Sequence, residues 1–175
     1  ASKDDGIAWI VNQVRDVFPG ARFYGTDGEF HAGAVPQLAA ANWLAAADYL
    51  RDVIPEGVLV DMGSTTTDII PLGHFTGLKG MTDLDRLRAG FLCYTGLLRT
   101  PVAAHLPEVT IGGVITPLAK EVFATAADAH LLLGHIRPEE FTCHPADRRG
   151  TGTADAVRRL SRMACSDPGE IGPGA

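Results

Sequence analysis

Apolar residues recur at helical spacing near the start of the chain. Ser2 and Asp5 can cap a helix there, and Pro19-Gly20 ends it. The apolar positions between them are Ile7, Ile10, Val11, Val14 and Phe18. This pattern predicts a first amphipathic helix.

Further helices and several short strands follow along the chain. Helical patterns cover residues 36–50, 82–87, 117–133 and 155–165, and the small residues of the first of these leave Trp43 as its packing anchor. Short apolar runs predict strands at residues 22–24, 57–62, 69–72 and 91–94. Helices mixed with short strands predict an α/β fold. Residues 166–175 hold three glycines and two prolines and are predicted to be a disordered tail.

The clearest local pattern is a hairpin in which a polar loop joins two apolar runs. The first run includes Val58 and Val60, and the second begins with Ile69, so we expect these three side chains to be buried. Between the runs lie two carboxylates, a glycine and four hydroxyl residues: Asp61, Gly63, Ser64, Thr65, Thr66, Thr67 and Asp68. We expect Asp61, Gly63, Thr66 and Asp68 to meet at one exposed rim of a sheet.

This loop has the groups that a phosphate site needs. Gly63 has no side chain, so a ligand can approach its backbone closely. Successive backbone N–H groups in such a turn form a concave anion site. Asp61 and Asp68 offer hard oxygen atoms of the kind that Mg²⁺ prefers. A plain polar turn uses the same residue types, but it does not need two carboxylates around four hydroxyls.

The segment Val-Leu-Val-Asp-Met-Gly-Ser-Thr-Thr-Thr-Asp-Ile-Ile at residues 58–70 resembles the second phosphate-binding hairpin of the actin-like ATPase superfamily. Within that superfamily, its Ser-Thr-Thr-Thr version resembles the hydantoinase A/oxoprolinase family. Other segments resemble the branch that serves tetrahydromethanopterin- and methanofuran-linked one-carbon metabolism. That branch is similar to an archaeal synthase that joins aminomethylfuran diphosphate to glutamyl-tyramine. These segments lie at residues 18–20, 24–28, 40–43, 94–96, 99–101 and 123–128.

The resemblance implies roles for individual residues. Asp61 and Asp68 would be catalytic and would position a Mg²⁺ ion. Phosphate or diphosphate oxygens, of ATP or of a diphosphate substrate, would be held by Gly63, Ser64, Thr65, Thr66 and Thr67.

The resemblance also predicts the domain organisation. Residues 1–165 would be the central part of an actin-like domain, because neither a first phosphate loop nor a C-terminal nucleotide motif is recognisable. The chain does not begin with Met, so we expect a processed or truncated piece of a longer protein. The longer protein would be an enzyme, and this chain alone would be inactive.

Composition limits the partners. The net charge is −6, which argues against broad nucleic-acid binding, because few basic groups are left to neutralise phosphates. A late cluster predicts a solvated helix face and loop: Arg148, Arg149, Arg158, Arg159 and Arg162. No apolar run is long enough for a membrane span, and no secretory leader is recognisable. Three sparse cysteines indicate reduced thiols and a cytoplasmic location. A homo-oligomer remains open.

Other candidate sites have weaker support. The segment from Asp61 to Thr65 partly matches the Asp-Thr-Gly signature of retroviral-type aspartic proteases, but the chain is too helical for that fold. His130 and His135 are five residues apart, which is off the spacing that aligns ligands on a helix face. Cys143 and His144 are adjacent, so in an extended segment they would point to opposite faces.

A second candidate site combines an aromatic ring, a fixed cation and a hydroxyl. Tyr94, Arg99 and Thr100 could bind an anionic or aromatic substrate. Pairing of Arg99 with a local acid is equally compatible with the sequence.

The leading function is therefore that of an enzyme of one-carbon coenzyme biosynthesis that binds a magnesium-complexed phosphate or diphosphate. Two alternatives remain open. One is an ATP-dependent cyclic-amide hydrolase, and the other is a non-catalytic scaffold of the same fold.

Overall fold

The computed structural model describes residues 2–171, and these divide into two compact units. The first unit comprises Ala1–Asp61 and Asp68–Cys93, and the second comprises Met62–Thr67 and Tyr94–Ala175. The hairpin loop thus belongs to the second unit, while most of its two strands belong to the first. The expectation that residues 1–165 are the central part of an actin-like domain stays a prediction.

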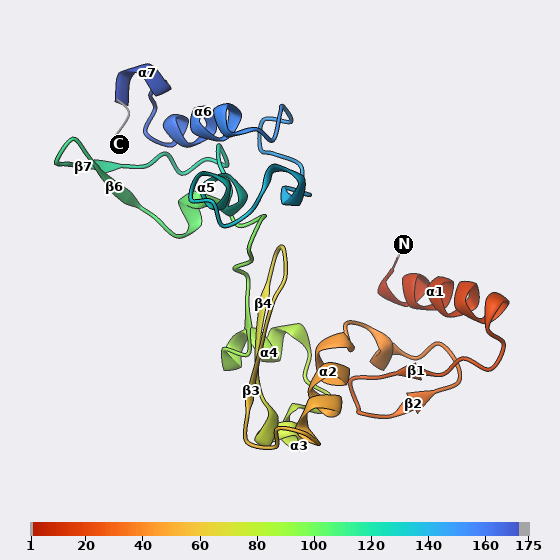
Figure 1. Ribbon diagram of the computed structural model, residues 1–175. Coiled ribbons are helices and arrows are strands. Elements are labelled where there is room, and N and C mark those ends of the chain that lie inside the picture. Colours follow the sequence, from red (N-terminus) through yellow and green to blue (C-terminus); the bar gives the residue numbers. More distant parts are fainter. Residues whose placement is uncertain (1, 172–175) are drawn as a thin grey trace. The chain divides into compact units, whose positions relative to one another are not determined.

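The elements of the first unit are shown in Figure 1. Its helices are α1 (Lys3–Val17), η1 (Pro36–Leu38), α2 (Asn42–Arg51), η2 (Leu72–His74), α3 (Phe75–Leu78) and α4 (Asp83–Ala89). Its strands are β1 (Phe23–Tyr24), β2 (Phe30–His31), β3 (Val58–Met62), β4 (Thr67–Pro71) and β5 (Leu92–Cys93). β1 and β2 pair antiparallel, and β3, β4 and β5 form a sheet in that order.

The second unit has fewer strands. Its elements are η3 (Val102–Ala104), β6 (Glu108–Ile111), β7 (Val114–Pro117), α5 (Ala126–Leu132), η4 (Pro138–Glu140), α6 (Thr153–Met163) and α7 (Pro168–Ile171). Both units therefore mix helices and strands, which confirms the predicted α/β class. None of the described helices has both the length and the apolar content that a membrane crossing needs.

Local capping explains where several helices begin. Ser2 and Asp5 form a reciprocal capping box at the start of α1, as predicted. Thr82 and Asp85 do the same for α4, which then ends at Gly90 in the left-handed conformation.

Each unit has its own buried core. In the first unit Trp43 is 2% exposed and packs with residues of α2, β4, η2 and α3: Leu44, Ala47, Ile70, Leu72, Phe75 and Leu78. In the second unit the core contains Leu98, Ala127, Leu131, Ile136, Phe141, Cys143 and Ala156.

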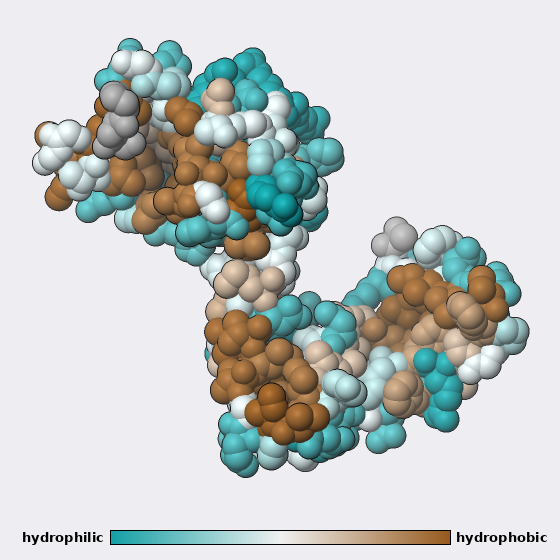
Figure 2. Space-filling model, viewed as in Figure 1, coloured by the Kyte–Doolittle hydropathy of each residue, from teal (hydrophilic) through white to brown (hydrophobic). Residues whose placement is uncertain are grey.

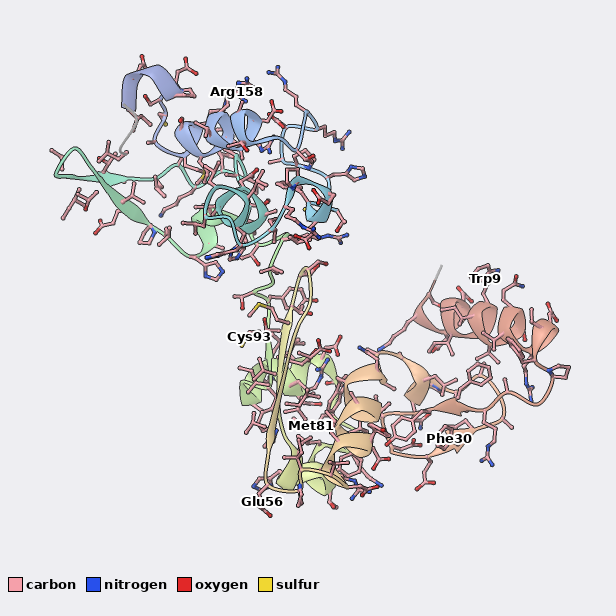
Figure 3. All side chains as sticks on the ribbon, viewed as in Figure 1. Trp9, Phe30, Glu56, Met81, Cys93 and Arg158 are labelled. Atoms are coloured by element: carbon pink, nitrogen blue, oxygen red, sulfur yellow. The ribbon has the colours of Figure 1, made fainter. Side chains whose placement is uncertain are left out.

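Three predicted burial positions are wrong. Val58, Val60 and Ile69 are 61%, 58% and 37% exposed, whereas Ile70 is 1% exposed. Side chains alternate between the two faces of a strand, and on β4 it is Ile70 that faces the core. In Figure 2 apolar surface accordingly gathers where Figure 1 draws β3. Trp9 on α1 and Phe30 on β2, both labelled in Figure 3, are also exposed.

Two helices are shorter than predicted. The sequence predicts a helix from Pro117. In the structure Pro117 is the last residue of β7, which pairs antiparallel with β6, and the helix α5 begins only at Ala126. Gly112 and Gly113 both have positive φ and make the tight turn that this hairpin requires. In the 36–50 segment, Ala40 has φ of 52°, which interrupts the helix between η1 and α2.

Part of the predicted disordered tail is helical. Residues 168–171 form α7, and its first turn is capped by Glu170, whose carboxylate accepts from Ser166 Oγ at 2.7 Å and from Asp167 N at 2.9 Å. Residues 172–175 lie outside the described residues.

The predicted solvated arginine cluster contains one buried member. The Arg159 side chain is 0% exposed, as is that of its partner Asp128. Arg159 Nε and Nη2 donate to Asp128 at 2.9 and 2.6 Å, and Nη1 donates to Asp147 and to the Gly150 carbonyl. A buried charge requires this degree of compensation, and the result is that α6 is fixed to α5.

Candidate anion site in the second unit

The loop between β3 and β4 is a tight turn, which we call the 63–66 turn. It is closed by one hydrogen bond, from Gly63 N to the Thr66 carbonyl at 2.8 Å. Ser64, Thr65 and Thr66 are partly buried, and Gly63 is exposed. The predicted strand–loop–strand arrangement is confirmed here.

A second segment of the same unit binds the carbonyl groups of this turn. This clamp segment, residues 95–100, donates from Leu97 N to the Gly63 carbonyl at 3.0 Å. Leu98 N and Arg99 N donate to the Ser64 carbonyl at 3.2 and 2.8 Å. The carbonyl groups of Gly63 and Ser64 therefore face the clamp segment, whereas that of Thr66 accepts within the turn.

The backbone N–H groups of the 63–66 turn, unlike the Gly63 and Ser64 carbonyls, make no hydrogen bonds to the clamp segment. Within residues 2–171, those of Ser64, Thr65 and Thr66 donate to no acceptor. The carbonyl groups of Gly63, Ser64 and Thr66 are already bonded, whereas three consecutive N–H groups have no described acceptor. Consecutive backbone N–H groups in a turn are one way in which proteins form an anion site.

Close packing against the clamp segment depends on Gly96. A Cβ atom on Gly96 would lie 2.5 Å from the backbone N and C of Thr65 and 2.6 Å from the backbone C of Ser64. No side chain fits at such distances, so any other residue at this position would displace the turn.

Not all predicted hydroxyls are free for a ligand. Thr67 is buried, and its hydroxyl donates to the Thr95 carbonyl at 2.6 Å. The buried Thr100 hydroxyl accepts from Gly96 N at 2.7 Å and donates to the Gly96 carbonyl at 3.0 Å. Ser64 Oγ and Thr65 Oγ1 lie 3.4 Å apart and, with Thr66, remain the hydroxyls nearest the free N–H groups.

Tyr94 and Arg99 are exposed, as a binding role requires. The backbone N–H of Arg99 donates to the Ser64 carbonyl. The Arg99 guanidinium pairs with no acid among residues 2–171. Because no described ion pair involves Arg99, its guanidinium is available to bind an anion. The positive charge of Arg99 also acts on the Cys143 thiol. Burial raises the pKa of that thiol, and Arg99 partly opposes the rise.

The two predicted metal carboxylates belong to the first unit. Asp61 is exposed near the end of β3, and no described residue hydrogen-bonds to its side chain. Asp68 instead accepts from the buried Arg86, which also donates to Asp83 at 2.9 Å. The Arg86 guanidinium lies over the Trp43 ring, 4.4 Å from its centroid. The metal roles of Asp61 and Asp68 stay predictions.

Other polar clusters do not form a ligand set. His130 Nδ1 and His135 Nδ1 lie 3.0 Å apart, because Gly134 turns the chain back at the end of α5. Their five-residue spacing in the sequence does not predict this close approach of the two rings. Nevertheless, residues 2–171 contain no group of three or more His, Cys, Asp or Glu side chains placed to hold a metal.

The second unit also contains an apolar groove of about 470 Å³ between the β6–β7 hairpin and helices α5, α6 and α7. Its walls include Leu106, Ile111, Leu132, Leu160 and Met163. No residue of the 63–66 turn lines it, so it is separate from the anion site.

The sequence missed the clamp segment as the partner of the turn. The two segments are about 30 residues apart, and no local periodicity connects them. The sequence did mark this segment in two ways, by the family-like stretches at residues 94–96 and 99–101 and by the candidate site of Tyr94, Arg99 and Thr100, but neither signal connects it to the turn.

An α/β fold with a hydroxyl-rich, N–H-lined turn defines a candidate phosphate-binding protein, and comparison with known proteins gives the family. The family model described as Hydantoinase/oxoprolinase matches residues 28–174, so the chain belongs to the hydantoinase/oxoprolinase family.

Two relatives share the name (4-{4-[2-(gamma-L-glutamylamino)ethyl]phenoxymethyl}furan-2-yl)methanamine synthase. The protein from Methanocaldococcus jannaschii is 36% identical over 173 residues, which are 95% of this chain and 52% of the relative. The protein from Methanococcus vannielii is 37% identical over 114 residues, which are 65% of this chain and 51% of the relative. The chain thus spans about half the length of the curated relatives it matches.

Proposed function

We propose that the 63–66 turn binds a magnesium-complexed phosphate or diphosphate in an enzyme of methanofuran- and tetrahydromethanopterin-linked one-carbon coenzyme biosynthesis. The observation that carries this proposal is the set of three consecutive N–H groups, on Ser64, Thr65 and Thr66, that have no acceptor among the described residues. Backbone N–H groups of this kind stabilise negative charge without reorganisation, because they are fixed by the fold.

The name of the relatives indicates a reaction class that needs such a site. Their product contains a furan ring and a phenoxy ring joined through a methylene group. For the chain and its longer protein we propose a transfer reaction of this kind. The phenol oxygen bonds to the furan methylene carbon, the bond from that carbon to a diphosphate oxygen breaks, and the phenol proton is lost. Inorganic diphosphate leaves with both electrons of the broken bond.

The turn would act on the leaving group in this reaction. Negative charge grows on the diphosphate as the carbon–oxygen bond breaks, and the three N–H groups would neutralise part of it. The hydroxyls of Ser64, Thr65 and Thr66 would add charge-assisted hydrogen bonds of about 1.5–3 kcal/mol each. Arg99 would supply a fixed positive charge, since no described acid neutralises it.

A Mg²⁺ ion, when bound, would supply further positive charge and order the phosphate oxygens. Asp61 fits the role of holding the ion or its waters, because its carboxylate is exposed and accepts no hydrogen bond from a described residue. Asp68 would support the metal through the carboxylate oxygen that Arg86 does not bind. These assignments follow the resemblance of the hairpin to actin-like ATPases, and an actin-like fold for the longer protein is part of the proposal.

Calorimetric titration of magnesium pyrophosphate into the chain tests this function. We expect saturable binding that depends on Mg²⁺, and we expect Asp61→Ala to abolish the Mg²⁺ dependence. Binding of ATP but not of pyrophosphate would favour the alternative of an ATP-dependent cyclic-amide hydrolase. A chain that binds neither ligand would contradict both and would leave a scaffold role.

A further inference from the structure

The hydroxyls of Thr67 and Thr100 are already bonded inside the second unit, although sequence patterns suggest that they contact ligands. We propose that Thr67, Thr100 and Gly96 are positioning residues that hold the 63–66 turn in its anion-binding form and do not touch the anion. This inference rests on the proposed function and adds to it the residues that shape the site.

Thr100 closes a small loop within the clamp segment. Its hydroxyl makes two hydrogen bonds to the same residue, accepting from Gly96 N at 2.7 Å and donating to the Gly96 carbonyl at 3.0 Å. A hydroxyl has one proton, so Thr100 has none left to donate to a phosphate oxygen. Because Thr100 is 5% exposed, the two bonds form away from water.

Thr67 holds the other end of the clamp segment. Its hydroxyl donates to the Thr95 carbonyl at 2.6 Å, and the residue is 6% exposed. Its single proton is therefore also used within the protein. The two threonines fix the backbone on both sides of Gly96, which is the residue that packs on the turn.

The clamp segment is in turn anchored to the core. The Thr100 carbonyl accepts from Ala126 N at 2.8 Å, and the Leu98 carbonyl accepts from Ala127 N at 3.1 Å. These donors lie in the first turn of α5, where N–H groups have no partner within the helix. Leu98 is itself a core residue. The turn is thus connected to α5 through carbonyl and N–H groups of one short segment.

The arrangement explains why the N–H groups of the turn are free. Leu97, Leu98 and Arg99 can donate to the turn only while the clamp segment keeps its shape. If the segment relaxes, the carbonyls of Gly63 and Ser64 lose these donors and the peptide groups can rotate. A rotated peptide group would point a carbonyl oxygen at the anion and repel it.

Isosteric variants test the inference. Thr100→Val and Thr67→Val remove a hydroxyl and keep the side-chain shape, whereas Thr100→Ser keeps the hydroxyl. We expect each Val variant to weaken pyrophosphate binding by about tenfold, as one to two lost hydrogen bonds would do, and Thr100→Ser to bind like wild type. Thr110→Val is the matched control, because Thr110 is exposed on β6 and has no side-chain hydrogen bond among residues 2–171.

If Thr67 and Thr100 served only stability, the Val variants would have lower melting temperatures and unchanged affinity for pyrophosphate. Affinities are therefore measured well below the melting temperature of every variant, where all are folded. If a Val variant does not fold, amide hydrogen exchange of wild type gives the second measurement. Pyrophosphate should slow exchange of the Gly96 N–H, which reports the bond to Thr100.

The outcomes separate the two proposals. Wild type that binds no pyrophosphate overturns the proposed function and this inference with it. Wild type that binds, together with Val variants that bind equally well or a Gly96 N–H whose exchange is unchanged, overturns the inference alone.

Discussion

At the scale of single residues, the site depends on backbone groups more than on side chains. The sequence predicted the turn because glycine and hydroxyl residues interrupt two apolar runs. It could not predict that Gly96 would pack on Thr65, since that contact joins segments with no shared pattern. It likewise could not show that Arg159 is buried, because charge alone predicts exposure and the compensating Asp128 lies 31 residues away.

Substitution at Gly63 separates folding from binding. A Cβ atom on Gly63 would meet only the Thr66 carbonyl oxygen, at 3.4 Å, which is ordinary contact. Gly63→Ala should therefore fold with a melting temperature close to wild type, whereas Gly63→Val should fold but lose pyrophosphate binding, since its side chain would occupy the ligand position. Calorimetric titration and thermal melts measure the two effects. Tight binding by folded Gly63→Val would show that the anion lies elsewhere.

At the scale of elements, the fold follows local signals where a cap and the helical spacing agree, as in α1 and α4. The β6–β7 hairpin shows the limit of these signals. The sequence pattern predicts no strand in residues 108–117 and a helix from Pro117, whereas the structure has β6 and β7 there. Pairing with β6 decided the structure, and such pairing depends on tertiary context.

The buried pair of Asp128 and Arg159 should dominate the stability of the second unit. Asp128→Ala leaves the buried guanidinium with only Asp147 and the Gly150 carbonyl, and it removes the acceptor of Thr125 N at the start of α5, so it should lower the free energy of unfolding by about 3–5 kcal/mol. The matched control is Asp155→Ala, because Asp155 pairs with the more exposed Arg158 at 2.8 Å. That change should cost about 0–1 kcal/mol. Urea unfolding measures both, and equal losses would contradict the assigned role of the buried pair.

The end of α5 should respond to pH. Burial lowers the pKa of His130, and the neighbouring His135 lowers it further. A folded-state pKa below that of the unfolded chain means that the unfolded state binds more protons. Stability is then fully present above pH 6.5 and is lost as pH falls toward the lowered folded pKa.

His130→Gln should remove this acid-side loss, whereas His144→Gln, at an exposed position, should leave it. Unfolding free energies measured between about pH 5 and pH 7 provide the comparison. A wild-type curve that stays flat over this range would show that the histidine pair does not contribute.

At the scale of the whole molecule, the chain is a member of the hydantoinase/oxoprolinase family that spans about half the length of its relatives. It exposes apolar side chains on α1 and β3. The family was predictable from the hairpin and its companion segments. The division into two units was not, because no composition shift or linker marks it.

Turnover by this chain alone should be absent or very low. Binding a phosphate needs only the turn and its clamp segment, but acting on the reacting carbon or phosphorus needs groups that the resemblance assigns to other parts of the longer protein. Assays of ATP and pyrophosphate hydrolysis with Mg²⁺ measure this. Robust hydrolysis that Asp61→Ala abolishes would show that the chain contains a complete active site.

The most direct test of the account is an amide NMR titration with magnesium pyrophosphate. The N–H resonances of Ser64, Thr65 and Thr66 should shift strongly and saturably, because these groups have no acceptor in the described part of the chain. The N–H resonances of Leu98 and Arg99, already bonded to the Ser64 carbonyl, should shift much less. Saturable binding that leaves the three turn resonances unchanged would contradict the central claim that this turn is the anion site.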